Sequence, residues 1–270
     1  MTTERLLPQA DRPTEDVQGH WLLARLGKRV LRPGGAGLTR LLLAAAGVRG
    51  ADVVELAPGL GRTADWILDL QPHAYVGVER DPVAAVAVDR VVAGRGGGVR
   101  IAVAADTGLP DACADVVVGE AMLTMQTDRG KRAIITEAVR LLRPGGRNAI
   151  HELGLTPDDI DEAAADGIRQ ELARTIRVNA RPLTEAEWRA LLTDAGLGVD
   201  RVDTAPMVLL RLRRNMAHER VVGTLRIVRN VLRDADARRR VLAMRKTFTR
   251  NADSMTGIAL VARLPAKDTR

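Results

Sequence analysis

The sequence is poor in aromatic residues and in cysteine. Phe, Trp and Tyr together make up 2% of its 270 residues, so the core must be built from aliphatic side chains. The single cysteine, Cys113, excludes an internal disulfide, a multi-cysteine zinc site and a cysteine-ligated iron–sulfur cluster. We therefore expect no metal site and a cytoplasmic protein.

Long apolar runs are also missing. No stretch is long enough to span a bilayer, and the start carries no signal-peptide pattern. Hydrophobic residues nevertheless make up 46% of the chain, enough for a normal core. At 270 residues we expect one α/β domain, 1–270, rather than two independent domains.

The net charge of +7 comes from one late segment. Between Arg211 and Arg250 there are thirteen Lys or Arg and three acidic residues, which leaves the remainder slightly acidic. Such a segment could lie on an anionic membrane or contact nucleic acid, whereas the simpler interpretation is a packed helix with a solvated charged face. The scarcity of stacking aromatics disfavours nucleic acid, and a peripheral membrane contact stays open.

One stretch organises the chain, Val53-Val54-Glu55-Leu56-Ala57-Pro58-Gly59-Leu60-Gly61-Arg62-Thr63. An apolar strand ends near a carboxylate, a turn with Gly59 and Gly61 follows, and a helix begins around Thr63. Glycines let a ligand lie against the loop, and the unsatisfied N–H groups of the helix suit a carboxylate or a phosphate.

The spacing of this loop leaves two nucleotide classes open. A dinucleotide site prefers G-x-G-x-x-G. Here Gly59 and Gly61 are the first two glycines, Ala64 stands at the third glycine position, and Ala57 precedes them. A nicotinamide dehydrogenase therefore remains an alternative. Glu55 is not required by a dinucleotide and would suit the amino group of a cationic ligand.

Strands and helices alternate along most of the chain. The sequence predicts a parallel sheet covered on both faces, with Asp81-Pro82 beginning a helix and Thr184 and Glu187 forming a capping box. We expect Arg32-Pro33-Gly34-Gly35 to stop the first helix. The predicted strands are 52–56, 74–79, 99–104, 115–119, 147–153, 199–210 and 257–264, and the main helices are 17–31, 38–46, 63–70, 128–142, 157–178, 184–195 and 215–250.

These motifs, in this order, resemble the class I S-adenosylmethionine-dependent methyltransferases, in particular the small-molecule type related to quinone-biosynthesis enzymes. The resemblance rests on the glycine loop, on acidic residues after successive strands, and on Leu141-Leu142-Arg143-Pro144-Gly145-Gly146 before the fifth strand. It implies that Glu79 holds the ribose hydroxyls and that Asp106 accepts from the adenine amine. The full implied cofactor-binding set is Glu55, Ala57, Gly59, Gly61, Glu79, Arg80, Asp106, Thr107, Glu120, Ala121 and Met122.

The resemblance also implies a fold and its subdivision. We expect a Rossmann-like, doubly wound, seven-stranded sheet, mostly parallel with an antiparallel last strand. The expected parts are a helical N-terminal lid (1–47), a cofactor-binding core (48–153), a helical insert (154–183) and a C-terminal half (184–270) with basic helices at 213–250.

Three residues are candidates for catalysis. His151 and Glu152 end the fifth strand, and one of them should face the pocket because strand neighbours point to opposite faces. His151 is a candidate general base, as is His20 on the lid helix. The alternative is that His151 is simply hydrogen-bonded at the sheet.

None of these motifs identifies the methyl acceptor. Met122, Leu123 and Met125 would give an aliphatic pocket and favour a small, apolar or lipid-like acceptor, unless they only fill the core. A non-catalytic nucleotide-binding scaffold, and a methyltransferase acting at a membrane or on nucleic acid through 211–250, remain alternatives. A homodimer is left open.

Overall fold

The computed structural model describes residues 7–27, 32–207 and 234–266. Residues 28–31 of the predicted first helix, 208–210 of the predicted strand 199–210 and 213–233 of the predicted basic helices lie outside the described residues. The helices are α1 (Gly19–Arg25), α2 (Ala36–Ala46), α3 (Arg62–Asp69), α4 (Pro82–Val92), α5 (Asp128–Leu141), α6 (Glu162–Ile176), α7 (Glu185–Asp194) and α10 (Ala235–Arg250). The strands are β1 (Asp52–Leu56), β2 (Ala74–Glu79), β3 (Gly97–Ile101), β4 (Ala114–Glu120), β5 (Leu142–Leu155), β6 (Leu183–Thr184), β7 (Gly198–Pro206) and β8 (Met255–Arg263), with short 3-10 helices η2 (Leu123–Met125) and η3 (Ala252–Ser254).

The strands form one mixed sheet in the order β3-β2-β1-β4-β5-β8-β7. Strands β1 to β5 pair in parallel, and β8 runs antiparallel between β5 and β7. The predicted Rossmann-like sheet with an antiparallel last strand is therefore confirmed. The two-residue strand β6, which pairs with the end of β5, is an addition.

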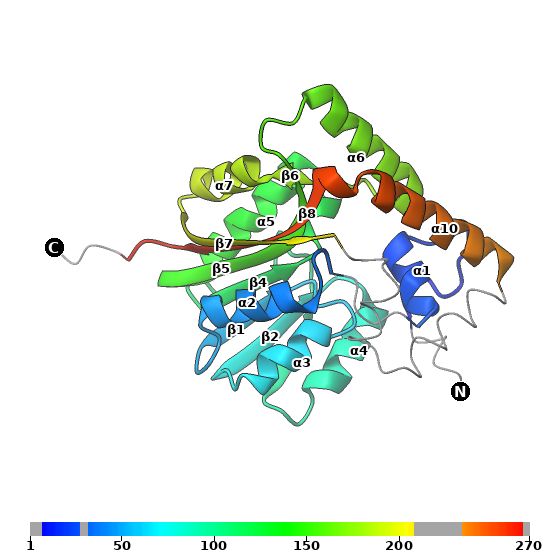
Figure 1. Ribbon diagram of the computed structural model, residues 1–270. Helices are drawn as coiled ribbons and strands as arrows, with labels where there is room; N and C mark the ends of the chain where they lie inside the picture. The colour runs from blue at the N-terminus through cyan, green and yellow to red at the C-terminus, as the bar shows by residue number, and fades with distance from the viewer. Residues whose placement is uncertain (1–6, 28–31, 208–233, 267–270) are drawn as a thin grey trace.

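Helices cover both faces of this sheet, with α2, α3 and α4 on one side and α5 and α7 on the other (Figure 1). One core cluster joins the first layer through residues such as Leu42, Ile67 and Val88. A second cluster joins the other layer through Ile135 and Trp188. Because both faces are covered, the central strands are continuous apolar runs, which is why their positions were predictable.

Local capping confirms two predicted helix starts. The Asp81 carboxylate accepts from the N–H groups of Val83 and Ala84 at the start of α4, with Pro82 at the first helical position. Thr184 and Glu187 exchange both bonds of the capping box before α7. These bonds satisfy N–H groups that a helix start leaves without partners.

The prediction for the first helix and its stop signal was wrong. Helix α1 ends at Arg25, and Gly27 follows with a φ of 100°. Arg32-Pro33-Gly34-Gly35 instead leads into the next helix, with Gly35 as the N-cap of α2. Helix α2 packs on β5 and β8, so it covers the sheet rather than forming part of a lid.

Other boundaries shift by a few residues. Strand β3 ends at Ile101 instead of Ala104. Strand β5 begins at Leu142 and so includes the second Arg-Pro-Gly-Gly sequence. The insert becomes helical only at α6, where the Asp161 side chain accepts from the Ala164 N–H.

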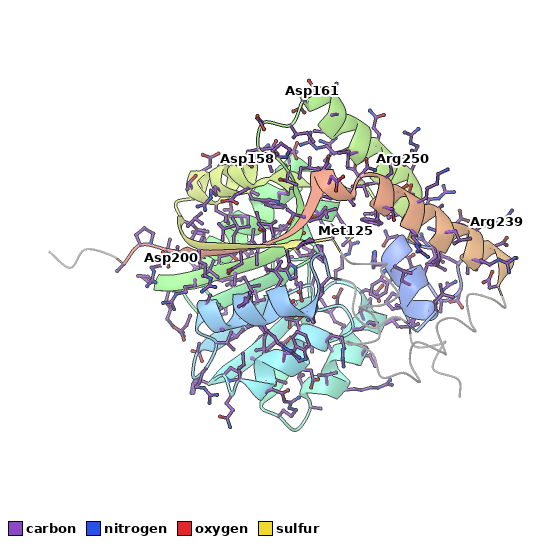
Figure 2. The ribbon with its side chains drawn as sticks, viewed as in Figure 1. Met125, Asp158, Asp161, Asp200, Arg239 and Arg250 are labelled. Carbon is purple, nitrogen blue, oxygen red and sulfur yellow. The ribbon has the colours of Figure 1, made fainter. Side chains whose placement is uncertain are left out.

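Helices α1, α6 and α10 pack together at one end of the sheet, through residues that include Leu22, Met244 and Ile176. Strand β8 runs toward the C-terminus at the left of Figure 1, and it is antiparallel to β5. The carboxyl ends of the parallel strands therefore point the other way, toward α1 and α10. Arg239 is exposed on the outside of α10 (Figure 2), whereas Arg250 reaches toward Glu171 of α6. The described part of the basic segment is thus a packed helix with a charged outer face, as the simpler interpretation predicted.

Candidate functional site

The strand order reverses between β1 and β4, and we call the region outside the carboxyl ends of these strands the crevice. These strands are parallel neighbours, with Leu56 opposite Gly119, while the chain leaves β1 toward β2 and leaves β4 toward β5. Ligands of open α/β sheets bind outside the carboxyl ends of the strands at such a reversal of strand order. Four features lie at the carboxyl ends of neighbouring strands: Glu55 and the glycine loop at β1, Glu79 at β2 and Glu120 at β4.

The loop after β1 has the backbone conformation that its glycines allow. Gly59 and Gly61 have φ values of 61° and 74°, and a Cβ on Gly59 would meet nothing within 4 Å. A Cβ on Gly61 would lie 3.1 Å from Val91, so this glycine lets the loop pack on α4. Ala57 has a φ of 53°, in the left-handed region that costs a residue with a Cβ some free energy. The loop therefore leaves an open cradle above Gly59, at the start of α3.

Glu79 ends β2 beside this loop and is 5% exposed. One carboxylate oxygen accepts from the Gly59 N–H and the other from the Asp81 N–H, each at 3.0 Å. Each oxygen keeps a second lone pair, so a braced carboxylate still has capacity for a pair of hydroxyls. Arg80, the next residue, is exposed.

Glu55 is buried beneath the loop, with 2% of its surface exposed. The Tyr75 hydroxyl donates to its Oε2 at 2.7 Å. Tyr75 reaches this point over Gly77, where a Cβ would lie 3.0 Å from the phenol oxygen. Burial raises the pKa of Glu55 to about 8, against the Tyr75 hydrogen bond and with a further rise from the charge of Glu120. Glu55 is therefore mainly protonated at neutral pH.

Asp106 and Thr107 follow β3 but differ in environment. Asp106 is exposed, and its N–H donates to Val103. Thr107 is fully buried, and its N–H and hydroxyl donate to Glu137 at 2.9 and 2.5 Å. Hydrogen bonds from Arg140 lower the pKa of Glu137 to about 2. Thr107 thus anchors the loop on α5, and Asp106 is the member of the pair that solvent and ligands can reach.

Glu120, at the end of β4, is the centre of a buried polar cluster. Its side chain is 7% exposed and accepts from the hydroxyls of Thr39 and Thr63. The guanidinium of Arg32 contributes an ion pair at 3.0 Å from Nε to Oε2. Burial opposes ionisation of Glu120, but the charge of Arg32 and the bond to His151 outweigh it and lower the pKa to about 2. Sequence reasoning missed Arg32, Thr39 and Thr63.

His151 belongs to the same cluster and has no exposed surface. Its Nδ1 lies 2.6 Å from Glu120, and its Nε2 lies 2.5 Å from the carbonyl oxygen of Pro33. Both ring nitrogens therefore lie within hydrogen-bond distance of an oxygen, and neither is free. This arrangement ties the segment before α2 to the end of β4.

Glu152 points to the opposite side of β5, as strand alternation requires. Its carboxylate accepts from the N–H groups of Met122, Leu123 and Thr124 at 2.7 to 3.0 Å, and from the Thr124 hydroxyl at 2.6 Å. Ala121 adopts a φ of 53° just before these residues. Glu152 therefore holds the turn between β4 and η2, with its side chain fully buried away from solvent.

His20 lies on α1, half-buried, with its ring centroid 4.7 Å from that of Trp21. Burial lowers the pKa of His20 to about 4, and the charge of Arg80 adds to this. The effect of Arg80 shows that α1 sits within electrostatic range of the end of β2. His20 is neutral at pH 7 and able to accept a proton.

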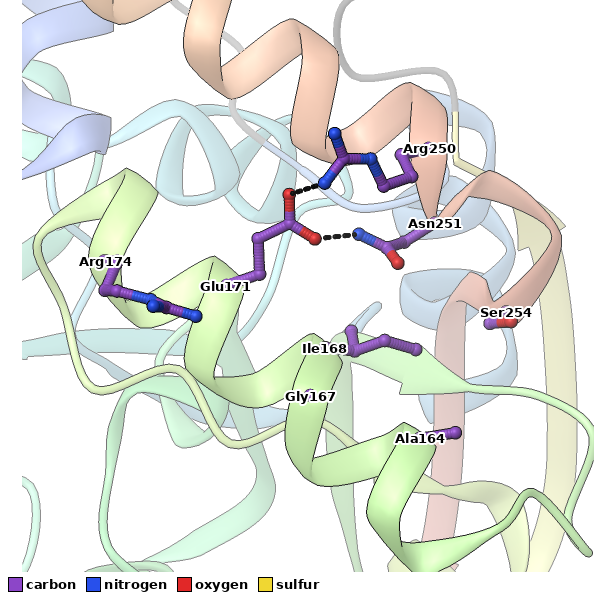
Figure 3. Close-up of a pocket in the computed structure, with 8 residues that line it drawn as sticks. All are labelled: Ala164, Gly167, Ile168, Glu171, Arg174, Arg250, Asn251 and Ser254. Atoms are coloured by element: carbon purple, nitrogen blue, oxygen red, sulfur yellow. Dashed lines mark hydrogen bonds and ion pairs between the residues drawn. The ribbon is translucent and has the colours of Figure 1, made fainter.

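A cavity of about 600 Å³ opens elsewhere, between α6 and the end of α10 (Figure 3). Glu171 occupies it and accepts from Arg250 and Asn251 at 3.1 and 3.0 Å. This cavity does not include any residue at the carboxyl ends of β1 to β4. In the described ranges no three metal-binding side chains cluster, and no helix is long and apolar enough to cross a membrane.

The chain is similar to known methyltransferases in sequence and in fold. The family model described as "Methyltransferase domain" matches residues 54–150. An uncharacterized protein of Haemophilus influenzae is 31% identical over 239 residues, which cover 87% of this chain and 93% of that protein.

Two solved structures show the shared fold. One is a geranyl diphosphate methyltransferase in complex with GPP and sinefungin, at 16% identity over 84% of this chain and 76% of that chain, with a TM-score of 0.59. The other is phosphoethanolamine N-methyltransferase 2 of Haemonchus contortus, in complex with phosphomonomethylethanolamine and S-adenosylhomocysteine, at 16% identity over 87% and 54% of the two chains, with a TM-score of 0.64. The open glycine cradle and the braced carboxylate after β2 fit a nucleoside cofactor of this kind. The chain belongs to the class I S-adenosylmethionine-dependent methyltransferases.

Proposed function

We propose that this enzyme methylates a small, apolar acceptor in the crevice between β1 and β4. The observation that carries the proposal is the convergence of the open Gly59 cradle, the braced Glu79 carboxylate and the buried Glu120 cluster at one edge of the sheet. Met122 and Leu123 add apolar surface at the end of β4, although both are buried in the free protein. The expected relation to quinone-biosynthesis enzymes fits such an acceptor and stays a prediction.

Each part of the crevice has a distinct role in this proposal. Glu79 receives the ribose hydroxyls, Gly59 and Gly61 let the nucleoside approach the backbone, and Asp106 accepts from the adenine amine. Arg80 lies next to Glu79 on the exposed side. Thr107, anchored by Glu137, fixes the position of Asp106. When bound, the cofactor supplies a methyl group on a positively charged sulfur.

The electrostatics of the crevice suit the transfer of that methyl group. The sulfonium charge disappears as the methyl group leaves, so an unpaired anion beside it would stabilise the ground state more than the transition state. Glu120 is paired with Arg32 and hydrogen-bonded to His151. Glu55 is mainly protonated in the free protein and pairs with the cofactor amine when it ionises on binding, so neither carboxylate is an unpaired anion beside the sulfur. Rate acceleration then comes mainly from alignment of the acceptor and exclusion of water.

His20 is the proposed proton acceptor, if the acceptor atom carries a proton. It is neutral at pH 7, whereas both nitrogens of His151 are engaged. Because its pKa lies well below neutral, His20 is a weak base, which suits an acceptor that loses its proton late or easily.

The proposal is tested by following S-adenosylhomocysteine formation with two acceptor panels, one of apolar phenols and alcohols and one of charged amines and amino acids. We expect turnover with the apolar panel, lost in Glu79→Ala and kept in Asp89→Ala, which changes an exposed carboxylate on α4. Turnover confined to the charged panel would contradict the proposed acceptor class.

A further inference from the structure

The cavity between α6 and the end of α10 has walls that are tied together by hydrogen bonds (Figure 3). Glu171 of α6 accepts at Oε1 from the Thr247 hydroxyl and from Arg250, each at 3.1 Å. Its Oε2 accepts from Asn251, at the end of α10, at 3.0 Å. The hydroxyls of Thr175 and Thr247 lie 3.1 Å apart. Because these bonds join the two helices, the shape of the cavity is set before any ligand arrives.

Small residues of α6 keep this cavity open. Ala164 and Gly167 line it one helical turn apart, and a Cβ on Gly167 would meet nothing within 4 Å. Gly167 lies in the interior of α6, where glycine destabilises a helix relative to alanine. The volume of about 600 Å³ is in the range of pockets that hold small organic molecules. The helix thus lacks a side chain at the point where one would fill the cavity.

The charges that line the cavity favour an anion. Arg174 of α6 and Arg250 of α10 face one carboxylate, that of Glu171. The hydrogen bond from Asn251 lowers the pKa of Glu171 against the effect of burial, so this carboxylate is ionised at neutral pH and already engaged by the protein. The C-terminal end of α10 adds the negative pole of the helix dipole, roughly half a charge. Two full positive charges still exceed the sum of these negative ones.

Unused hydrogen-bond donors remain on both arginines. Arg250 donates to Glu171 through Nη1, and Arg174 donates to the Gln170 carbonyl through Nε. In the part of the chain that the structure describes, their other N–H groups and the Ser254 hydroxyl at the edge of the cavity have no protein partner. Guanidinium groups that approach from two helices suit an anion with several oxygens, which can accept from both at once.

We propose that this cavity is a second ligand site, which binds the phosphate group of a small molecule between Arg174 and Arg250. The phosphate oxygens accept from the two guanidinium groups and from Ser254, and the organic part of the ligand occupies the open space above Gly167. The site shares no residue with the crevice, so it does not depend on the function proposed above. A bound phosphate joins α6 to α10 and therefore stabilises the folded protein.

The test uses three probes, so that a free phosphorylated molecule and a lipid headgroup are distinguished. Inorganic phosphate and glycerol 3-phosphate are titrated calorimetrically, and phosphatidylcholine vesicles with and without phosphatidic acid are tested by co-sedimentation. Arg174→Met and Arg250→Met each remove one set of donors. Gly167→Leu fills the cavity and keeps every charge, and it should fold because leucine favours a helix and the space is open. Melting temperatures show which variants are folded and whether a probe stabilises them.

The matched control is Arg239→Met, which removes one exposed arginine of α10 outside the cavity (Figure 2). We expect wild type and this control to bind one glycerol 3-phosphate per chain, more tightly than inorganic phosphate, and to melt at a higher temperature when it is bound. Arg174→Met and Arg250→Met should each bind roughly tenfold more weakly, the effect of a hydrogen bond to a charged group. Gly167→Leu should bind neither soluble probe measurably.

Binding confined to the phosphatidic acid vesicles, and lost in Gly167→Leu, would support the same site and identify a lipid headgroup as its ligand. Full binding by Gly167→Leu, or an equal loss in Arg239→Met, would overturn the inference, because the anions would then follow the surface charge of α10 and not the cavity. Failure of wild type to bind any of the three probes would overturn it as well.

Discussion

Binding of the cofactor should release a proton from Glu55. This carboxyl group lies at the end of β1 with a pKa of about 8, because burial and the nearby charge of Glu120 oppose its ionisation. Among the described residues only Tyr75 donates to it, through Oε2, which leaves Oε1 for a ligand. The amino group of S-adenosylmethionine is a cation suited to that oxygen, and a cation beside a carboxylate lowers its pKa.

The size of this effect follows from the pKa alone. With a pKa of about 8, roughly nine in ten Glu55 side chains are protonated at pH 7. If the bound ammonium lowers the pKa to about 5 or less, binding releases about 0.9 proton per cofactor at pH 7. Near pH 9.5 the release should give way to proton uptake, because Glu55 is then already ionised while the free amine, with an ordinary pKa of about 8, must gain a proton to bind as an ammonium.

Calorimetry in buffers of different ionisation enthalpy measures this proton directly. The observed binding enthalpy should vary linearly with the buffer enthalpy, with a slope of about 0.9 proton at pH 7. Glu55→Gln is the matched variant, since the amide oxygen still accepts from Tyr75 and carries no titrating group. Its slope should be near zero. A wild-type enthalpy that does not depend on the buffer at pH 7 would refute the placement of the ligand amine beside Glu55.

Three further predictions concern stability, each measured by denaturant or thermal unfolding. Ala57→Gly should stabilise the protein by about 0.5–1 kcal/mol, because glycine adopts the φ of 53° without steric cost; unchanged or reduced stability would contradict strain at this residue. Gly257→Ala should destabilise by at least about 2 kcal/mol, because its Cβ would lie 2.5 Å from the backbone of Pro33; a neutral effect would show that this close packing is dispensable. The pKa of His20 falls from 6.5 to about 4 on folding, so the unfolded state binds a proton first as the pH drops. Wild type should therefore lose up to about 3 kcal/mol of stability between pH 6.5 and pH 4, and His20→Asn should lose less. Equal losses would exclude His20 as the cause.

The sequence predicted best the elements that are bounded by local chemistry. Strands β1 and β2 have the predicted ends, since each is a buried apolar run followed at once by a Pro- or Gly-containing turn or an Asp-Pro helix start. Glu55 and Glu79 lie at or next to the ends of these strands, so the sequence alone predicted that both belong to the crevice.

The Glu120 cluster could not be predicted because its partners are far apart in the chain. Arg32, Thr63 and His151 meet Glu120 only when the sheet brings β4 and β5 together and the segment before α2 crosses β8 at Gly257. Arg32-Pro33-Gly34-Gly35 was interpreted as a helix stop, since proline and glycine have that local effect. The same four residues recur at 143–146 within β5 and contribute no partner to Glu120, so the repetition does not mark the cluster.

The contacts of His151 and Glu152 also come from distant parts of the chain, and this is why the sequence could not decide whether either residue is a free base. Strand alternation correctly placed them on opposite sides of β5. Whether a buried polar group is free to react depends on its hydrogen-bond partners, however, and these come from Pro33 and from the turn after β4. No local pattern in the sequence marks those contacts.

The most direct test of the account is calorimetric titration of S-adenosylmethionine and S-adenosylhomocysteine into wild type, Glu79→Ala and the surface control Asp89→Ala. We predict that Asp89→Ala binds each ligand as tightly as wild type does. Folded Glu79→Ala should bind neither ligand measurably. Unchanged binding by Glu79→Ala would contradict the assignment of the cofactor to the carboxyl end of β2.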